Sequence, residues 1–316
     1  MAKNKAPFRI GIIPINGFAL MSYAATVEPL RAANLLNGAD LYETTNIQIG
    51  ETPAKSSGLG LEPPQILLKT APDFDLVLLV AGSNAVGYQN PQLASWLRRT
   101  ARSGTLIGGV SAGPVFLAQN GLLLNRRMTV HWEHADFIQE NIPDALLEKS
   151  LYVIDRDRMT CGGGTAPMDL MLALIANQHG QKLAQQVGDW FLHTAIRPAT
   201  GPQRAGLAQR YDTTSIPVLA AIKAIQTHIA NPLTLPQLAK IAGASPRQLS
   251  RLFTTAVGKT PMAFGRQIRL EKARSLLASA PLSVSEVALM TGFSSAAHFS
   301  TAYSKQYGAP PSAARR

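Results

Sequence analysis

The residues best suited to chemistry in this 316-residue chain lie in the pentapeptide 109–113 (GVSAG), which fits the pattern G-x-S-x-G. In that pattern a strand ends, a tight turn presents the serine, here Ser111, and a helix begins behind it. His131 follows at a distance at which it could serve as the base for this hydroxyl, with Glu133 or Glu28 to orient it. The motif therefore predicts acyl-transfer chemistry or a polar ligand site. A small-residue turn that serves only helix–strand packing is the competing interpretation.

Metal and thiol chemistry have much weaker support. The single cysteine, Cys161, excludes an internal disulfide framework or a cysteine-based zinc finger. His131 and His134 make a weak metal pair because the other ligands of a site are not evident. We therefore expect neither a metal nor a cofactor.

A second group of residues suits the recognition of nucleic acid. Arg247 and Arg251 are four residues apart, so in a helix they share one face, with Ser250 beside them. Arginine binds guanine in a bidentate manner, which makes these residues candidates for reading bases. Contact with phosphate alone is the alternative for both arginines.

The charge distribution supports this interpretation. Residues 213–316 carry 12 basic and 2 acidic side chains, a net charge of +10, whereas residues 1–212 carry only +1. A basic domain of this kind attracts polyanions, and double-stranded DNA is the leading candidate. A membrane surface fits less well, because a peripheral anchor needs exposed large apolar residues. A basic surface that only aids solubility is the remaining alternative.

The same basic region contains an internal repeat. Residues 236–258 (PQLAKIAGASPRQLSRLFTTAVG) resemble residues 285–308 (SEVALMTGFSSAAHFSTAYSKQYG). Each unit predicts a short helix, a turn with Gly243 or Gly292, and a second helix, which is the helix-turn-helix pattern. Residues suited to helix caps frame these helices. They are Ser245, Ser283, Glu286, Gly258 and Gly308.

The apolar period of residues 260–279 predicts a helix about 30 Å long between the two units. Such a rod could hold both second helices in successive major grooves, which are about 34 Å apart. The second unit has Ala297 and Thr301 where the first has its arginines, so we expect the first unit to read most of the sequence. The second would add contacts to phosphate and to thymine methyl groups. The residues expected to contact phosphate are Lys305, Ser295 and His298, and the residue expected to contact a thymine methyl group is Ala296 or Ala297.

The first two thirds of the chain predict a different fold. Apolar runs at 8–13, 76–80 and 105–110 suit buried parallel strands, and helical patterns at 22–36 and 91–103 lie between them. Strand alternating with helix indicates an α/β three-layer sandwich.

The division into domains follows from composition. We expect an N-terminal domain over 1–197, a linker rich in proline and glycine over 198–215, and an all-α domain with two helix-turn-helix units over 216–316. The longest apolar runs are too short to span a bilayer. We therefore expect no membrane association and a cytoplasmic, nucleoid-associated protein.

The C-terminal region resembles the DNA-binding domain of the AraC/XylS family of transcription regulators. The resemblance depends on the segments LSRLF, GKTP, RLEKARSLL and HFSTAY-KQYGAPP and on their spacing. It implies promoter binding by two helix-turn-helices, usually for activation, with RNA polymerase as a partner.

The N-terminal region resembles the class I glutamine amidotransferase/PfpI-like superfamily, and more closely its subgroup fused to an AraC domain. The segments are EPLRAAN from Glu28, the elbow, MTVHW over 128–132, GGTA--DLML after Cys161, and RP----QR over 197–204. The resemblance implies a flavodoxin-like sandwich and a homodimer. In catalytic relatives the elbow residue is a cysteine, with a glutamate nearby after the first strand.

Here the elbow residue is Ser111, a much poorer nucleophile than a thiolate unless a strong base activates it. We therefore expect a catalytically silent domain that retains Ser111, His131 and Glu28 as vestiges and senses a small effector. Trp132 could stack on a cationic ammonium group. The expected effector wall is Glu28, Ser111, Ala112, His131 and Trp132. By resemblance, such regulators control the catabolism of nitrogen-containing metabolites such as amino acids or betaines.

Two other functions remain open from the sequence. A serine-dependent hydrolase or amidase with a DNA-binding tail would use Ser111 for catalysis. An architectural protein would use its α/β domain only to dimerise.

Overall fold

The computed structural model describes residues 6–58, 60, 63, 66–279 and 282–314. The contacts within the chain divide it into two compact units, Met1–Arg204 and Ala205–Arg316. Each unit is described by itself.

The first unit is built on one large sheet. Its strands are β1 (Phe8–Pro14), β2 (Tyr42–Gln48), β3 (Ile66–Leu67), β4 (Leu76–Ala81), β5 (Leu106–Ser111), β8 (Tyr152–Asp155) and β9 (Arg158–Cys161). Among the described strands, these seven pair in the order β3-β2-β1-β4-β5-β9-β8. All neighbours are parallel except β8, which runs antiparallel to β9. The short strands β6 (Arg127–Met128) and β7 (Leu146–Leu147) form a separate parallel pair.

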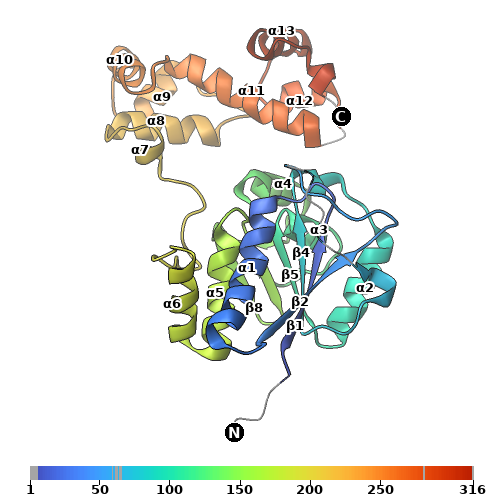
Figure 1. Cartoon of the computed structure of the whole chain (residues 1–316). Helices are drawn as coiled ribbons and strands as arrows, with labels where there is room; N and C mark the ends of the chain where they lie inside the picture. Colours follow the sequence, from blue (N-terminus) through green and yellow to red (C-terminus); the bar gives the residue numbers. More distant parts are fainter. Residues whose placement is uncertain (1–5, 59, 61–62, 64–65, 280–281, 315–316) are drawn as a thin grey trace. The chain divides into compact units, whose positions relative to one another are not determined.

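Helices cover both faces of this sheet, as expected for a parallel sheet that is buried on both sides. The helices are α1 (Leu20–Asn37), α2 (Pro91–Arg102), α3 (Gly113–Gln119), α4 (Ala135–Asn141), α5 (Ala166–His179) and α6 (Gln181–Trp190). In Figure 1, α5 and α6 lie to the left of the strands and α2 to the right. Short 3₁₀ turns span Leu68–Thr70, Ser83–Gly87 and Trp132–His134.

Strand β4 shows how the two cores form. Its side chains alternate between the core under α1, α5 and α6 and the core under α2 and α3. The first set is Leu76, Leu78 and Val80, and the second is Val77, Leu79 and Ala81. The predicted three-layer α/β fold is confirmed.

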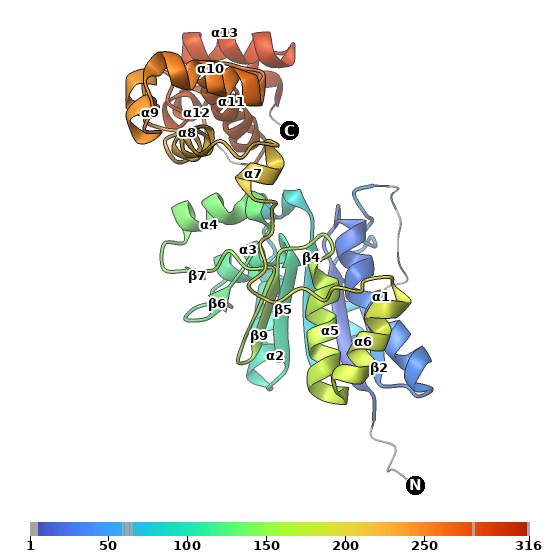
Figure 2. The same ribbon diagram turned by 90° about the vertical axis from the view of Figure 1, so that its left-hand side faces the viewer.

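The second unit is helical. Its helices are α7 (Leu207–Arg210), α8 (Ile216–Thr227), α9 (Leu235–Ile241), α10 (Pro246–Val257), α11 (Pro261–Ser279), α12 (Val284–Met290) and α13 (Ala296–Tyr307), and a 3₁₀ turn follows at Pro311–Ala314. Figure 1 shows α11 running between the pair α9–α10 and the pair α12–α13, and in Figure 2 the two pairs overlap along the line of sight. Phe264 of α11 lies in the core of the first pair, and Leu270 and Leu277 lie in the core of the second. The predicted helix over 260–279 is therefore a spine shared by both pairs. No helix in the described part of the chain is long and apolar enough to cross a membrane.

The predicted linker over 198–215 is divided between the two units. Its first part is bonded to the first unit, where the Leu151 amide donates to the Ala199 carbonyl at 2.8 Å. Its later part packs on the second unit, where the Tyr211 ring meets Phe264 edge-on at 5.6 Å. Proline and glycine mark this segment as irregular chain, but they do not leave it free.

Candidate functional sites

The predicted elbow forms a strained turn at the end of β5. Ser111 has φ 61°, a left-handed value that costs a non-glycine residue about 1–2 kcal/mol. Neighbouring glycines make the turn possible. A Cβ on Gly109 would lie 2.6 Å from the Pro114 nitrogen, and one on Gly163 would lie 2.5 Å from the Ser111 Cβ. The backbone therefore approaches Ser111 more closely than any side chain would allow.

Ser22 is the α1 residue that the hydrogen bonds connect to this elbow. The Gly164 amide donates to the Ser22 hydroxyl at 2.8 Å, and Gly163 packs against Ser111. Ser22 is only 1% exposed. The site thus lies where β5 and β9 end and α1 begins, at the carboxyl edge of the parallel sheet, where open α/β folds bind ligands.

Glu28, by contrast, has no hydrogen bond to the elbow among the described residues. Its carboxylate accepts two hydrogen bonds from Arg31, at 2.7 and 2.9 Å, and its side chain is 39% exposed. The cause is the phase of the helix. Six residues after Ser22, at about 100° a residue, Glu28 points about 120° away around α1. The structure therefore puts Ser22 where the sequence suggested a glutamate.

His131 lies beside the elbow, but its ring is not bonded to the serine. The His131 amide donates to the Ser111 carbonyl at 3.2 Å. The His131 Nδ1 accepts from the Glu133 amide at 3.4 Å, and the Glu133 carboxylate lies 3.8 Å away. Among the described residues, no hydrogen bond joins the Ser111 hydroxyl to the ring. Burial lowers the pKa of His131; the Glu133 charge opposes this effect and the Arg204 charge adds to it.

Trp132 presents an aromatic face beside His131, and that face is already covered. Its side chain is 44% exposed, and the guanidinium carbon of Arg204 lies 4.1 Å from its ring centroid. Ala112 is fully buried, and its amide donates to the Ala81 carbonyl at 3.4 Å. Ala112 therefore shapes the turn from within the sheet, whereas Trp132 faces outward.

The second candidate site is on α10. Ser245 caps this helix by accepting from the Gln248 amide at 3.3 Å, as predicted. Leu249 is buried, whereas Arg247 and Arg251 are both exposed on another face. In the described part of the chain, no carboxylate forms an ion pair with either arginine. Ser250 lies half-buried beside them.

Helix α13 repeats this design without the arginines. Ser295 caps it by accepting from the His298 amide at 3.1 Å, and Phe299 and Tyr303 are buried. The outward residues are Ala297, Thr301, His298 and Lys305, with Ala296 half-buried. The Thr301 hydroxyl donates to the Ala297 carbonyl at 3.0 Å. At the two positions that match Arg247 and Arg251, α13 thus exposes only the small side chains of Ala297 and Thr301.

Comparison with known proteins agrees with both halves. Residues 9–177 match the DJ-1/PfpI family, and residues 238–316 match the helix-turn-helix domain family. The HTH-type transcriptional regulator GlxA of Rhizobium meliloti is 42% identical over 98% of this chain and 95% of its own length. The chain belongs to this family of DJ-1/PfpI–helix-turn-helix regulators.

Other members of the regulator family give the same result. The HTH-type transcriptional regulator CdhR of Pseudomonas aeruginosa is 39% identical over 94% of this chain and 88% of its own. The crystal structure of an AraC family transcriptional regulator from Pseudomonas putida covers 58% of this chain and 100% of its own, at 27% identity and a TM-score of 0.54. The resemblance to both families is confirmed.

One contact of this regulator involves a side chain that the sequence did not mark as part of a site. The Gln203 side chain accepts from the Trp132 amide at 2.8 Å and donates to Thr129, Val130 and Ser150 at 2.7 to 3.0 Å. Gln203 and Arg204 belong to the RP----QR segment, so their sequence signal was visible but their contacts were not. Among the described residues, no group of three His, Cys, Asp or Glu side chains could hold a metal ion.

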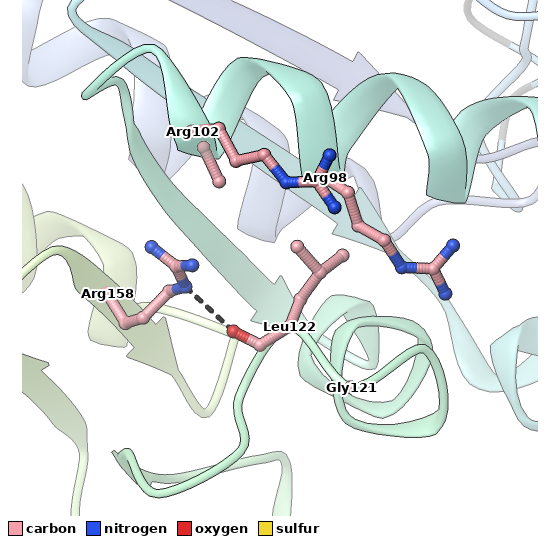
Figure 3. Close-up of a pocket in the computed structure, with 6 residues that line it drawn as sticks. Arg98, Arg102, Gly121, Leu122 and Arg158 are labelled. Carbon is pink, nitrogen blue, oxygen red and sulfur yellow. Dashed lines mark hydrogen bonds between the residues drawn. The ribbon is translucent and has the colours of Figure 1, made fainter.

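A hollow at the opposite edge of the regulator's sheet is lined by arginines. It has a volume of about 220 Å³ and is bordered by Arg98, Arg102 and Arg158 (Figure 3). Arg158 donates to the Leu122 carbonyl at 2.7 Å, and Arg98 donates to the Asn120 carbonyl at 3.0 Å. These carbonyls follow the end of α3, where no further turn of helix can bond them. Both arginines therefore have a structural role, and the hollow is separate from the elbow.

Proposed function

We propose that the chain is a transcription regulator that binds promoter DNA through α10 and α13 and responds to a small molecule at the elbow. One observation carries the DNA half: two capped helix-turn-helix units share the spine α11, and one of them exposes the pair Arg247 and Arg251. At 19 residues, or about 28 Å, α11 nearly matches the spacing of successive major grooves. Promoter DNA with two half-sites about one turn apart fits this arrangement.

Selection of bound sequences from a random DNA pool, with the full-length protein, tests the DNA half. We expect enrichment of two half-sites, with stronger preference in the one that α10 reads. Specific recognition would be contradicted if the recovered DNA showed no enriched sequence and if its affinity for the protein depended only on the salt concentration.

The effector half rests on the elbow region. Ser111, Ser22, His131 and Trp132 place hydroxyl, imidazole and aromatic groups at the carboxyl edge of the sheet. A nitrogen-containing metabolite such as an amino acid or a betaine suits this chemistry. A metabolite panel tested by thermal shift on the full chain, then by DNA affinity at fixed salt, examines this proposal. The proposal is wrong if none of the compounds that bind the protein alters its affinity for DNA.

We further propose that the elbow is catalytically silent. The Ser111 hydroxyl is not hydrogen-bonded to His131 in the described structure, and a serine without a bonded base is a weak nucleophile. The strained φ of Ser111 favours one alternative, a serine-dependent hydrolase. Turnover of p-nitrophenyl acetate by the wild type, abolished in Ser111→Ala, would establish the hydrolase. Equal, near-zero rates in both proteins support silence.

The remaining partners follow from the proposed role. A regulator of this kind would act on DNA in the cytoplasm as a homodimer and contact RNA polymerase as an activator. Sedimentation of the full chain with and without DNA tests the dimer. Transcription in vitro with purified polymerase tests activation, and a decrease in transcript would identify a repressor instead.

A further inference from the structure

The segment 197–204, here called the exit strap, is the last part of the first unit, and it is bonded along its length. Asp169, with no exposed surface, accepts from the Arg197 amide and from its guanidinium at 2.6 to 3.0 Å. The Ala199 carbonyl then accepts from the Leu151 amide at 2.8 Å. These contacts fix the start of the strap to α5 and to the strand β8 region.

Gln203 makes the densest contact of the strap. Its Nε2 donates toward three oxygens, and its Oε1 accepts from the Trp132 amide. Gly162 is adjacent, and a Cβ there would lie 2.8 Å from the Gln203 amide carbon. The Gln203 side chain thus fills the space between the Trp132 backbone and the glycine run that packs on Ser111.

Arg204 is the final contact of the strap. Its guanidinium stacks on Trp132 at 4.1 Å, and the next residue, Ala205, begins the second unit. A cation over a tryptophan face gains about 0.5–1 kcal/mol at an exposed site, enough to hold a chain segment but small enough for a ligand to overcome. One ring face accommodates one cation at a time.

We infer that Arg204 is a resident cation, that an effector with an ammonium or guanidinium head group replaces it on Trp132, and that this exchange loosens the exit strap where the DNA-binding unit begins. The inference rests on the proposed effector site and specifies how that site is coupled to the rest of the chain. The effector would then act through the strap, because its cation would bind the same Trp132 ring on which Arg204 stacks. The Gln203 bond to the Trp132 amide joins the same residue to the strap by a second route.

Hydrogen exchange of the Trp132 amide in the full-length protein tests this inference, because that amide is bonded to Gln203 of the strap. Arg204→Ala should raise its exchange rate roughly two- to fivefold, the factor that a surface cation–π contact provides. Arg204→Lys, which keeps the cation, should remain near wild type. Arg99→Ala is the matched control, because the side chain of this exposed arginine bonds only the Ser95 hydroxyl among the described residues.

Tetramethylammonium chloride, compared with sodium chloride at equal ionic strength, is the probe for the exchange of cations. It should raise Trp132 amide exchange in the wild type toward the Arg204→Ala rate and have no further effect on that variant. Unchanged exchange in either the variant or the tetramethylammonium arm overturns the inference. This readout needs neither DNA nor a natural effector, so its failure is distinct from failure of the metabolite panel.

Discussion

Gly243 and Gly292 occupy equivalent positions in the two helix-turn-helix turns, but only Gly292 is packed against another part of its unit. Both have left-handed φ values, 64° and 71°. A Cβ on Gly243 would meet nothing within 4 Å, whereas a Cβ on Gly292 would lie 2.5 Å from the Ile229 carbonyl oxygen and 2.7 Å from the Pro232 ring. The two alanine substitutions therefore separate backbone strain from steric conflict.

The expected costs follow from these distances. A left-handed alanine costs about 1–2 kcal/mol, partly offset by about 0.4–1 kcal/mol because the alanine restricts the unfolded chain. Gly243→Ala should then destabilise the second unit by about 1 kcal/mol. At Gly292 a backbone oxygen and a proline ring must also move, which adds about 1–3 kcal/mol of overpacking. Gly292→Ala should cost about 2–4 kcal/mol in total, or roughly 10–20 °C in Tm for a unit of this size.

The distribution of tryptophan makes the assay selective. All 3 tryptophans, Trp96, Trp132 and Trp190, precede residue 205, so their fluorescence reports only the first unit. Far-UV circular dichroism reports the helices of both units. We expect Gly292→Ala to lower the Tm measured by circular dichroism, whereas the Tm measured by tryptophan fluorescence should not change. Equal losses of Tm in the two variants would contradict a steric cost at Gly292. A parallel shift of the fluorescence transition would contradict an effect confined to the second unit.

Three further predictions concern the two candidate sites and the core. Arg247→Ala should relax the preference at one base step and cost about 1–3 kcal/mol of binding free energy, which binding-site selection measures. Lys305→Ala should weaken binding to all DNA sequences alike and reduce the slope of log affinity against log salt concentration by about one, which salt titration measures. Burial lowers the pKa of both His131 and His134 from the usual 6.5, so as the pH falls the unfolded chain binds protons before the folded chain does. The two neutral histidines should therefore contribute fully to stability above pH 6.5, and this contribution should be lost as the pH falls below 6.5. Urea unfolding followed by tryptophan fluorescence should show this loss, and glutamine at both positions should reduce it. Burial also raises the pKa of the Cys161 thiol to about 12, so iodoacetamide should label it only after unfolding, and rapid labelling of the native protein would contradict the burial.

Much of the second unit was predictable from its sequence because the signals are short-range. A cap, a glycine and an apolar period act within a few residues of one another, so the helix expected over 260–279 appears as Pro261–Ser279. Ser283 and Glu286 form the expected capping box, with bonds of 2.6 and 3.1 Å. The repeat also located both turn glycines. It did not reveal that Gly292 alone is packed, because its neighbours come from the segment between α8 and α9.

The elbow illustrates the same limit in the first unit. The sequence placed Ser111 on a strained turn, because glycines on both sides of a serine at the end of a strand are typical of such a turn. It did not identify the residue of α1 that is hydrogen-bonded to the glycine turn beside Ser111. The phase of α1 against the Gly163–Gly164 turn selects Ser22 and directs Glu28 to Arg31. Helix phase against a distant loop is a property of packing, which no local pattern encodes.

The sequence alone was enough to predict an α/β domain joined to a basic domain with two helix-turn-helix units, because charge, repeats and periodicity can be read without a fold. It also determined that the elbow holds Ser111 instead of a thiol. The folded chain was needed to show that the supposed linker begins as a bonded strap and that Arg204 covers Trp132. Residues about 70 positions apart meet there because the sheet brings its carboxyl edge and the end of the first unit together, and that proximity depends on the whole fold.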